Sequence, residues 1–450
     1  MSFGYDLIII GSTPAAIFAA LTATSLKARV ALIVQKGNIE RNESILTSAL
    51  AQTGSLAWAK EVISIVTEQN NLGNLAALGV DVINTAGEFC RLPQPGFVVK
   101  NKRLSSRAYI IATGSRQATP NLKINYLTFE DIWKKDDLTY LSDKLIIVGG
   151  SPQAIEIAQT LHKIGKDITL VVEENQILPQ EEPEASLLIQ AKLEAEGIKI
   201  LQNSPITQAT IIDGKKWVQA GDRAIETDEI IMATSRRKPL IEGLNLEGVG
   251  VEVGETGIKV NEKLQTTNPQ IYALGDITGG YSLPNIAQYE AQIALKNALF
   301  LPLLKTDYRY LPIAILTEPQ IARVGMTEAQ AKRRYGEDVF VGQKYFKTIS
   351  KAIMLEKTTG YCKIIVRGNG ELLGACIVGT NAGELIGAIA LAMSNKLKLK
   401  AIAELPFPSP SFGEIITQTA LELQKNLLQN NKTLKDCLET LFIWRRNWKI

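Results

Sequence analysis

Cysteine and histidine are scarce in this sequence, and their scarcity excludes two kinds of site. Its only cysteines are Cys90, Cys362, Cys376 and Cys437. They lie far apart without a C-x-x-C pair, which excludes a disulfide framework and suits a reducing, cytoplasmic compartment. The one histidine, His162, is too few for a histidine-based metal site, and we expect no metal. A formal net charge of only +3 gives no reason to expect a nucleic-acid partner.

Long uncharged runs are also rare, and one alone has the length of a membrane helix. Residues 7–26, LIIIGSTPAAIFAALTATSL, carry no charge. No basic segment precedes them, and Gly11, Pro14 and several hydroxyl residues interrupt them. A strand, a tight turn and a buried helix produce the same run, so we predict no transmembrane segment.

The sequence repeats one unit at an offset of 138 residues. LIIIGSTPAAI at 7–17 matches LIIVGGSPQAI at 145–155. Each copy has an isoleucine-rich strand, a turn at glycine and a helical pattern, and a second apolar strand follows at 29–34 and 167–172. This succession is typical of a doubly wound parallel sheet. We therefore predict two Rossmann-like, three-layer α/β domains.

The two glycine turns are degenerate dinucleotide-binding fingerprints. In G-x-G-x-x-G/A the first glycine makes the turn, the second admits a pyrophosphate, and the third position lets helix and strand pack closely. Thr13 and Ser151 replace the middle glycine and are placed as helix N-caps, each before a proline. A βαβ unit without nucleotide is the alternative for one such turn, whereas two in register favour nucleotide binding. The residues assigned to the turns are Gly11, Thr13, Pro14, Ala15, Ala16, Gly149, Ser151 and Ala154.

The residue after the second strand of each unit indicates which ribose that unit would hold. Glu173 and Glu174 follow LVV in the second unit, where a carboxylate accepts from a 2′-hydroxyl and repels a 2′-phosphate. The aligned residue of the first unit is Gln35, so that site has at best an amide. We predict NAD(H) rather than NADP(H), although the basic residues 236–238 in another loop complicate this assignment.

Two later motifs place further residues at a sheet edge. IIATGS contains Thr113 and Gly114, and the apolar strand in IYALGD ends at Gly275 and Asp276. Ligands of parallel sheets bind at the carboxyl ends of the strands, so Asp276 is a candidate ligand residue. A helix N-cap is the structural alternative for this aspartate.

The last third of the chain has a different pattern. The strand-like runs GYCKIIVRG and ELLGACIVG alternate and precede a long helical pattern, NAGELIGAIALAMSNKL. This order favours an antiparallel sheet with helices, and hence a separate α+β domain.

Six motifs in order resemble those of the flavoprotein disulfide reductases, the family of dihydrolipoamide dehydrogenase and mercuric reductase: GSTPAA, IIATGS, GGSPQAIEIA, IYALGD, LTEPQIARVGMTE and GACIVGTNAGELI. The resemblance implies FAD in the first unit, with Asp276 on its ribityl chain, and a nicotinamide cofactor in the second. It implies a homodimer through the last domain. The implied boundaries are 1–140 and 264–305 for the FAD domain, 141–263 for the NAD(P) domain, 306–430 for the dimerisation domain and 431–450 for a tail.

The chain departs from this family at the residues that carry thiol chemistry. The family's redox-active C-x4-C lies on the helix after the first unit, where this chain reads QKGNIERNESILTSALAQTG at 35–54. Disulfide exchange needs sulfur, and Ser44 or Ser48 cannot replace it. The family's P-S-K lysine is absent too, while its glutamate partner aligns with Glu156. We therefore predict no dithiol chemistry.

The family's C-terminal signature is altered as well. Its H-P-T-x-x-E loop aligns with SPSFGE, so Ser409 stands at the histidine and Glu414 at the orienting glutamate. A serine hydroxyl does not titrate near neutral pH and cannot serve as the acid–base partner. The catalytic residues are therefore unknown, with Glu156, Glu414 and Ser409 as candidates, and a structural role in the dimer is the alternative for Glu414.

The tail KTLKDCLETLFIWRRNWKI carries leucines at helical spacing, followed by a cluster of tryptophan and arginine. Packing across the dimer is one interpretation, and contact with a membrane surface or another partner is the other. The residues concerned are Leu434, Leu438, Leu441, Trp444, Arg445, Arg446 and Trp448.

Two functions of different classes follow from these patterns. In the first, a nicotinamide cofactor reduces FAD, and the flavin passes electrons to a small acceptor such as a quinone, a dye, oxygen or another nucleotide. In the second, the chain is a non-catalytic dimeric binding or scaffold protein with weak cofactor binding or none. Glu173 and Asp276 favour the enzyme. Thr13, Gln35 and Ser235, which stands at a family glycine, favour the scaffold, and we adopt the enzyme as the working hypothesis.

Overall fold

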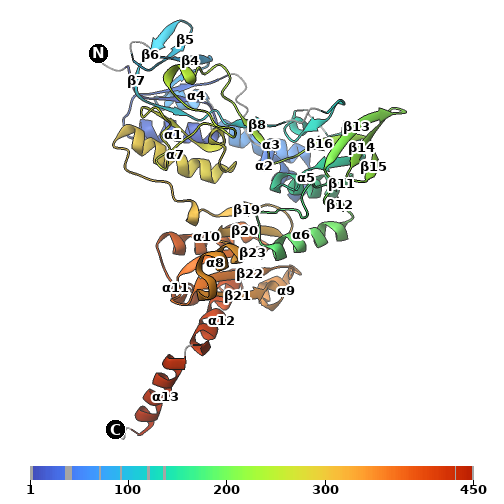
Figure 1. Cartoon of the computed structure of the whole chain (residues 1–450), viewed down its shortest axis with the longest axis vertical. Coiled ribbons are helices and arrows are strands. Elements are labelled where there is room, and N and C mark those ends of the chain that lie inside the picture. Colours follow the sequence, from blue (N-terminus) through green and yellow to red (C-terminus); the bar gives the residue numbers. More distant parts are fainter. Residues whose placement is uncertain are drawn as a thin grey trace. The chain divides into compact units, whose positions relative to one another are not determined.

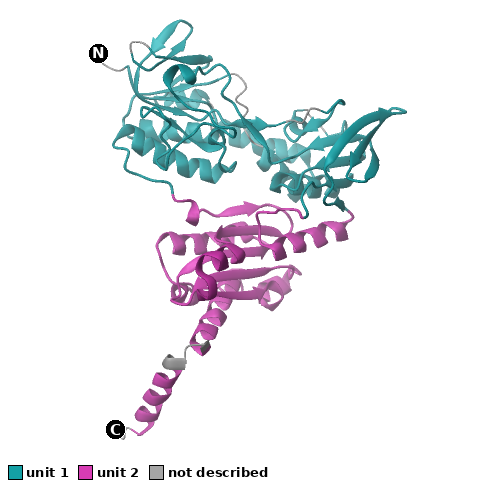
Figure 2. Ribbon diagram, viewed as in Figure 1, with its two compact units in different colours: residues 1–175, 198–306 teal, residues 176–197, 307–450 magenta. Residues whose placement is uncertain are grey.

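The computed structural model describes residues 4–35, 43–69, 72–91, 94–118, 122–134, 138–430 and 432–447. The chain divides into two compact units, which are coloured separately in Figure 2. Unit 1 comprises residues 1–175 and 198–306, and unit 2 comprises residues 176–197 and 307–450.

Unit 1 contains a parallel sheet of strand order β18-β7-β1-β2-β3, between helices and a small antiparallel sheet (Figure 1). On β1, Leu7 and Ile9 pack against the helices, whereas Ile8 and Ile10 pack against the small sheet. Both faces of the strand are thus buried, which is why its sequence is a continuous apolar run. The elements are β1 (Tyr5–Ile10), β2 (Val30–Ile33), β3 (Asp81–Ile83), β7 (Ser106–Ile111), β18 (Ile271–Ala273), helices α1 (Pro14–Ser25) and α7 (Pro284–Leu299), and the small sheet β4 (Gly87–Cys90), β5 (Gly96–Val99) and β6 (Lys102–Leu104).

The same three layers occur a second time in unit 1. A parallel sheet of order β12-β11-β10-β16-β9 packs against α5 on one side, and against an antiparallel sheet through Ile146, Met232 and Val218 on the other. The prediction of two Rossmann-like three-layer domains is confirmed. The elements are β9 (Leu127–Thr128), β10 (Lys144–Val148), α5 (Pro152–Lys163), β11 (Asp167–Val171), β12 (Lys199–Leu201), β13 (Ile206–Ile212), β14 (Lys215–Ala220), β15 (Arg223–Thr227) and β16 (Glu229–Met232).

Further elements of unit 1 join the two assemblies. Helix α2 (Glu43–Thr53) packs against both α3 (Leu56–Gln69) and α5, and α4 (Leu72–Ala77) precedes β3. The short strands β8 (Ser115–Gln117) and β17 (Arg237–Pro239) pair antiparallel. This pairing brings a segment that follows the second parallel sheet next to one that follows β7 of the first.

Unit 2 is built on an antiparallel sheet of order β19-β20-β23-β22-β21 with helices on both faces, which confirms the predicted α+β domain. Its strands are β19 (Ile313–Ile315), β20 (Gln320–Gly325), β21 (Val339–Tyr345), β22 (Tyr361–Arg367) and β23 (Leu372–Gly379). Its helices are α6 (Pro183–Glu196), α8 (Glu328–Tyr335), α9 (Ser350–Met354), α10 (Ala382–Ser394), α11 (Leu399–Ala403), α12 (Glu414–Asn430) and α13 (Lys432–Asn447).

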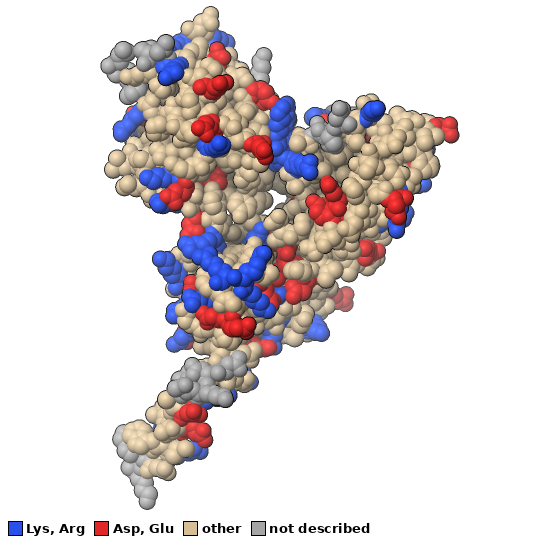
Figure 3. All heavy atoms as spheres, viewed as in Figure 1, with Lys and Arg blue, Asp and Glu red and all other residues tan. Residues whose placement is uncertain are grey.

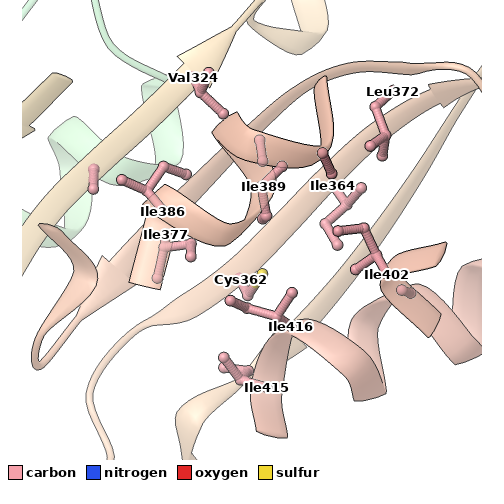
Figure 4. Close-up of a cluster of buried hydrophobic side chains, with 14 of the residues drawn as sticks. Val324, Cys362, Ile364, Leu372, Ile377, Ile386, Ile389, Ile402, Ile415 and Ile416 are labelled. Carbon is pink, nitrogen blue, oxygen red and sulfur yellow. The ribbon is translucent and has the colours of Figure 1, made fainter. Parts of the chain in front are cut away.

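The strands β22 and β23 are buried on both faces, because helices cover both sides of their sheet. Cys362 and Ile364 of β22 face α10 and α12, where they contact residues such as Ile416 (Figure 4). Ile365 packs on the opposite face against Ala331 of α8. Cys362 and Cys376 are both buried in this sheet as small core residues.

One charged side chain of β22 is also buried, and it explains why α6 belongs to unit 2. The Lys363 side chain is only 1% exposed, and its Nζ lies 2.9 Å from Glu184, 3.0 Å from Glu328 and 3.3 Å from Glu182. Glu184 lies in α6 and Glu182 just before it. Residues 176–197 belong to unit 2, although the predicted boundaries place them in the NAD(P) domain. Within this segment, Glu182 and Glu184 make the ion pairs with Lys363.

The molecular surface carries both signs of charge on the face shown in Figure 3. Among the described residues, no helix has the length and apolar character needed to cross a bilayer. The segment at 7–26 is instead the predicted strand, turn and helix. The predicted tail helix exists as α13, although the position of Trp448 lies outside the described residues.

Candidate functional site

The predicted ligand residues of unit 1 gather at one edge of the first sheet. Strands β1, β2, β7 and β18 run parallel, so the turns that follow them meet at the carboxyl edge. These turns supply Gly11 and Thr13 after β1, Gln35 after β2, Gly114 after β7, and Asp276 after β18. The sequence motifs, spread over 266 positions, thus form one site of the kind that binds ligands in doubly wound folds.

The first turn is held closed by its threonine. Thr13 is the N-cap of α1; its hydroxyl donates to the carbonyl of Ala112 at 3.0 Å and accepts from the N–H of Ala16 at 3.3 Å. A Cβ on Gly11, which has φ +123°, would meet the Ala112 oxygen at 2.2 Å. Only glycine fits this close approach of the turn to β7.

Ser151 repeats this arrangement in the second turn. Its hydroxyl donates to the carbonyl of Ala233 at 2.8 Å and accepts from the N–H of Ala154 at 3.2 Å. Gly149, with φ +131°, stands where Gly11 stands in the first turn, and a Cβ there would lie 2.7 Å from the Ala233 oxygen. The sequence repeat is therefore a repeated pair of hydrogen bonds, and both predicted N-caps are confirmed.

Asp276 lies in a polar network at the first edge. The hydroxyls of Ser282 and Ser115 donate to its carboxylate at 3.0 and 3.3 Å. The helix-cap alternative does not describe it, because the N-cap of α7 is Leu283 and that of the short 3-10 helix Gly275–Thr278 is Leu274. Its carboxylate is 12% exposed and remains at the ligand edge.

Arg237 is a member of this network that the sequence analysis did not assign to the site. Its Nε donates to Ser115 Oγ at 2.9 Å and lies 3.9 Å from the Asp276 carboxylate, while its Nη2 donates to Glu130 at 3.2 Å. The residue reaches the first edge from β17, which pairs with β8. No spacing in the sequence indicated this, because the contact joins positions 122 residues apart.

The other predicted contacts at this edge are engaged with protein groups. Gln35 Nε2 donates to the carbonyl of Gly87 at 2.9 Å, which turns the amide toward β4. Thr113 Oγ1 donates to the carbonyl of Leu240 at 2.7 Å. Gly114 has φ +77°, and a Cβ on it would lie 3.3 Å from the Thr13 methyl, so the threonine side chain occupies the space beside this glycine.

The carboxyl edge of the second sheet is built from fewer groups. Glu173 and Glu174 follow β11 as predicted, and both side chains are exposed. Strand β11 runs parallel to β10, which ends at the Gly149 turn, so the two glutamates and the turn share one edge. Exposed carboxylates at this place are open to a ribose hydroxyl and unfavourable to a phosphate.

The helix that carries the redox-active cysteines in the family is present here as α2, and its sequence contains no cysteine. Ser44 and Ser48 lie on α2, which packs against α5, the helix that carries Glu156. Positions 36–42 of the aligned stretch lie outside the described residues. Cys90 lies in β4, where the Arg103 Nε donates to its sulfur at 3.4 Å. His162 lies in the last turn of α5, with its Nδ1 3.1 Å from the Lys166 carbonyl oxygen.

Ser409 and Glu414 lie together in unit 2, as their alignment with the family's loop suggested. Glu414 is the first residue of α12, and its carboxylate accepts from the Ser411 N–H at 3.1 Å. Hydrogen bonds from Ser409 and from this N–H lower the pKa of Glu414, so it is ionised at neutral pH. The contacts are those of a loop and helix start, which favours a structural role over an acid–base role.

The first edge fits a dinucleotide cofactor in part. The close turn at Gly11, the glycine at 114 and the Asp276 carboxylate match what such a ligand requires. Thr13 replaces the glycine that would let the backbone approach a pyrophosphate. Gln35 replaces the carboxylate that would accept a hydrogen bond from the ribose. The donor set therefore fits FAD with fewer contacts than a full fingerprint would give.

Comparison with known proteins agrees with this geometry. The chain is 30% identical to mercuric reductase of Staphylococcus aureus over 466 residues, covering 94% of this chain and 83% of the relative. It is also 30% identical to a dihydrolipoyl dehydrogenase of Bacillus subtilis over 319 residues, covering 69% of this chain and 68% of that protein.

Solved structures show the same fold. The Cu(II) complex of the HOCl-induced flavoprotein disulfide reductase RclA from Escherichia coli superposes with a TM-score of 0.84 at 24% identity, covering 94% of this chain and 100% of that one. LpdA from Mycobacterium tuberculosis gives the same TM-score and identity, covering 93% and 99%. Residues 5–291 match the family model of the pyridine nucleotide-disulphide oxidoreductases, and residues 311–420 match that family's dimerisation domain, which indicates a homodimer. The chain belongs to the pyridine nucleotide-disulphide oxidoreductase family of flavoproteins.

Proposed function

We propose that this chain is a homodimeric FAD-dependent oxidoreductase that takes electrons from a nicotinamide cofactor and passes them from flavin directly to a small, non-disulfide acceptor. The observation that carries the proposal is the Asp276 carboxylate, held by Ser115 and Ser282 at the edge where Gly11 and Gly114 turn. A carboxylate held at a sheet edge among glycine turns suits the sugar and phosphate parts of a dinucleotide.

The chain's own residues position the cofactor in this proposal. Bound FAD would supply the acceptance and release of electrons. Asp276 would accept hydrogen bonds from ribityl hydroxyls, and its ion pair with Arg237 would hold the carboxylate in one orientation. Glu130 fixes Arg237 from the other side. These three side chains are 12–18% exposed, so their mutual attraction is less screened than it would be at the surface.

The non-disulfide acceptor is inferred from where the sulfur atoms lie. Burial raises the pKa of Cys362 to about 12 and that of Cys376 as well, so neither forms a thiolate near neutral pH. Both lie in the sheet of unit 2 and not at the ligand edge of unit 1. Cys90 and Cys437 lie in separate units, which supports an electron path without a dithiol.

The proposal is tested by the flavin content and acceptor range of the purified dimer. Heat-treated protein is expected to release flavin near one per chain, and NADH is expected to drive reduction of a quinone or dye but not of lipoamide, glutathione disulfide or Hg(II). The Cys90→Ala/Cys437→Ala variant should keep the dye activity. Turnover of a disulfide that disappears in this variant would contradict the proposal.

The second candidate function is a non-catalytic dimeric scaffold. The Thr13 hydroxyl occupies the N–H of Ala16, and its methyl group fills the space beside Gly114. Both features reduce the room and the donors available to a pyrophosphate. Protein that is colourless as purified and fails to take up added FAD would establish this function in place of the enzyme.

Thr13→Gly is expected to raise the affinity for FAD about tenfold. The change releases the Ala16 N–H, and a hydrogen bond from it to a charged phosphate is worth about 1.5–3 kcal/mol. Loss of the cap should cost the helix only a few tenths of a kcal/mol. The measurement is FAD titration of deflavinated protein, with Ser151→Gly as the matched control that should leave FAD affinity unchanged. A weaker affinity in Thr13→Gly would mean that the hydroxyl itself contacts the cofactor.

NADH is expected to reduce the flavin about tenfold faster than NADPH at subsaturating concentration. Glu173 and Glu174 are exposed at the second edge, where they favour a 2′-hydroxyl and repel a 2′-phosphate. Stopped-flow measurement of flavin absorbance gives the two rates. Glu173→Gln should reduce the difference between the rates with NADH and NADPH, whereas Glu196→Gln on α6 should leave this difference unchanged. Faster reduction by NADPH in the unmodified protein would refute the assignment.

A further inference from the structure

The two nucleotide turns of unit 1 are each bonded to a segment that leads into the same two-stranded ribbon, β8 and β17. The Thr13 hydroxyl donates to the carbonyl of Ala112, and the Ser151 hydroxyl donates to that of Ala233. Ala112 directly follows β7 and leads into β8, whereas Ala233 directly follows β16 and leads into β17. The position of each turn is therefore linked to the position of one strand of the ribbon.

The two strands of the ribbon are bonded together beyond their paired residues. The N–H of Leu240 donates to the Gly114 carbonyl at 3.0 Å, and the N–H of Ala118 donates to the Arg236 carbonyl at 2.9 Å. The Thr113 hydroxyl donates to the Leu240 carbonyl at 2.7 Å. Because bonds of this kind join both ends of the ribbon, a shift of β17 is carried to β8 at the first edge.

One face of the ribbon contacts both parallel-sheet assemblies. Ser115 and Gln117 of β8 are 3% and 6% exposed, and the register places Arg237 of β17 opposite Gln117. Opposite residues of an antiparallel pair share a face, so these three side chains lie on the buried face of the ribbon. Ser115 donates to Asp276 at the first edge. Gln117 accepts from the N–H of Phe129, which follows β9 of the second sheet.

Arg237 brings positive charge to a group of carboxylates at this face. Its Nη2 donates to Glu130, and its Nε lies 3.9 Å from the Asp276 carboxylate. Glu290 is a third carboxylate, 3% exposed, and it accepts from the N–H of Gly275. The pyrophosphate of FAD would add negative charge at the same edge, so the affinity for FAD depends on this arginine. The strand that carries the arginine comes from the second assembly.

We propose that Arg237 couples the two cofactor sites, so that a nicotinamide dinucleotide bound at the second edge tightens the binding of FAD at the first. Ligand at the second turn would fix the Ser151 hydroxyl and, with it, Ala233. The ribbon would then hold Arg237 against Asp276, where it orients the carboxylate and offsets its charge. Such coupling is reciprocal, so FAD tightens the binding of the dinucleotide by the same factor. The identity of the two cofactors rests on the proposed function.

The first test measures whether the two sites respond to each other. Deflavinated full-length protein is titrated with FAD, without NAD⁺ and with saturating NAD⁺, which does not react with oxidised flavin. NAD⁺ should lower the dissociation constant of FAD about fivefold, and FAD should lower that of NAD⁺ equally. Ser151→Gly removes the bond to Ala233, so its FAD affinity without NAD⁺ should be unchanged, while the response to NAD⁺ should disappear. Unmodified protein that binds both cofactors with constants independent of each other would overturn the coupling.

The second test assigns the coupling to Arg237. Arg237→Gln should raise the dissociation constant of FAD about tenfold and remove the response to NAD⁺, because Asp276 loses its counter-charge. Arg237→Lys keeps the charge without the forked contact to Ser115 and Glu130, and its dissociation constant should lie between those of the other two proteins. Arg116→Gln is the matched control, since Arg116 is 51% exposed on the other face of the ribbon, and it should change neither quantity.

A double-mutant cycle separates this role from a purely structural one. In the Asp276→Asn background, Arg237→Gln should raise the dissociation constant of FAD no further, because the arginine acts through this carboxylate. Multiplication of the two separate losses would show that Arg237 only stabilises the fold, and would overturn the assignment.

Glu130→Gln provides a second variant in case Arg237→Gln does not fold. It removes the carboxylate that holds the guanidinium from the second assembly and keeps the shape of the side chain. The response of FAD binding to NAD⁺ should be lost, with an unchanged circular dichroism spectrum. An undiminished response would overturn the role of Arg237. Unmodified protein that takes up no FAD would contradict the proposed function, whereas FAD binding without a response to NAD⁺ would contradict the coupling alone.

Discussion

Lys363→Met is expected to lower the free energy of unfolding by about 3–5 kcal/mol, because removal of one partner strands buried charge on the other. The Lys363 ammonium is 1% exposed and faces Glu182, Glu184 and Glu328. Burial alone would lower its pKa, but the hydrogen bonds that the ammonium donates to Glu184 and Glu328 outweigh burial and raise it. The lysine is therefore charged at all physiological pH values, and the Glu182 carboxylate, 2% exposed, depends on it.

The control for this variant is a lysine whose ion pair lies at the surface. Lys357 contacts Glu318 at 2.6 Å, with both side chains about half exposed. Lys357→Met should change stability by less than about 1 kcal/mol, since exposed ion pairs contribute little. Urea unfolding at fixed protein concentration compares the two variants. Equal effects would show that the buried cluster of unit 2 does not stabilise the fold as its geometry indicates.

Gly11→Ala should cost about 3–5 kcal/mol and remove bound flavin. The new methyl group would lie 2.2 Å from the Ala112 oxygen and 2.5 Å from its carbonyl carbon, both of them backbone atoms that cannot rotate away. The turn would have to separate from β7, which would also break the hydrogen bond from Thr13 to Ala112. Strained backbone and overpacking each cost about 1–3 kcal/mol.

Gly165→Ala separates the effect of conformation from that of close approach. Gly165 also has a positive φ, +95°, but nothing lies within 4 Å of a Cβ placed there. This variant should cost only about 1–2 kcal/mol, the conformational penalty of a left-handed residue, and should leave the flavin in place. If both variants were equally stable, the contact between the Gly11 turn and β7 would not be the close one described.

The parts of the site that could be predicted are those that depend on residues close together in the sequence. Thr13 and Ser151 were identified as N-caps because hydroxyl residues are preferred at the N-cap and proline is preferred at the first position of a helix. Asp276 was placed at the ligand edge because parallel strands bring their carboxyl ends together. Both inferences need only the order of strand, turn and helix.

The parts that escaped prediction depend on which elements pack together. Arg237 joins Asp276 because β17 pairs with β8, and nothing within either strand specifies the other. Strand β22 is buried on both faces because helices pack on both sides of its sheet, and the sequence of the strand does not identify those helices. Lys363 has the sequence context of a solvent-facing residue, and its burial is set by carboxylates about 180 positions away.

The paired hydrogen bonds of Thr13 and Ser151 bear on how the protein is made in the cell. Each turn satisfies its own helix terminus from within the chain, where a full fingerprint leaves backbone groups for a bound phosphate. Synthesis in flavin-starved cells should therefore yield a folded, colourless apoprotein in place of an aggregate. The flavin content and the folded fraction of a preparation are then independent quantities. A low flavin content indicates a limited supply of flavin during synthesis and does not by itself indicate misfolded protein.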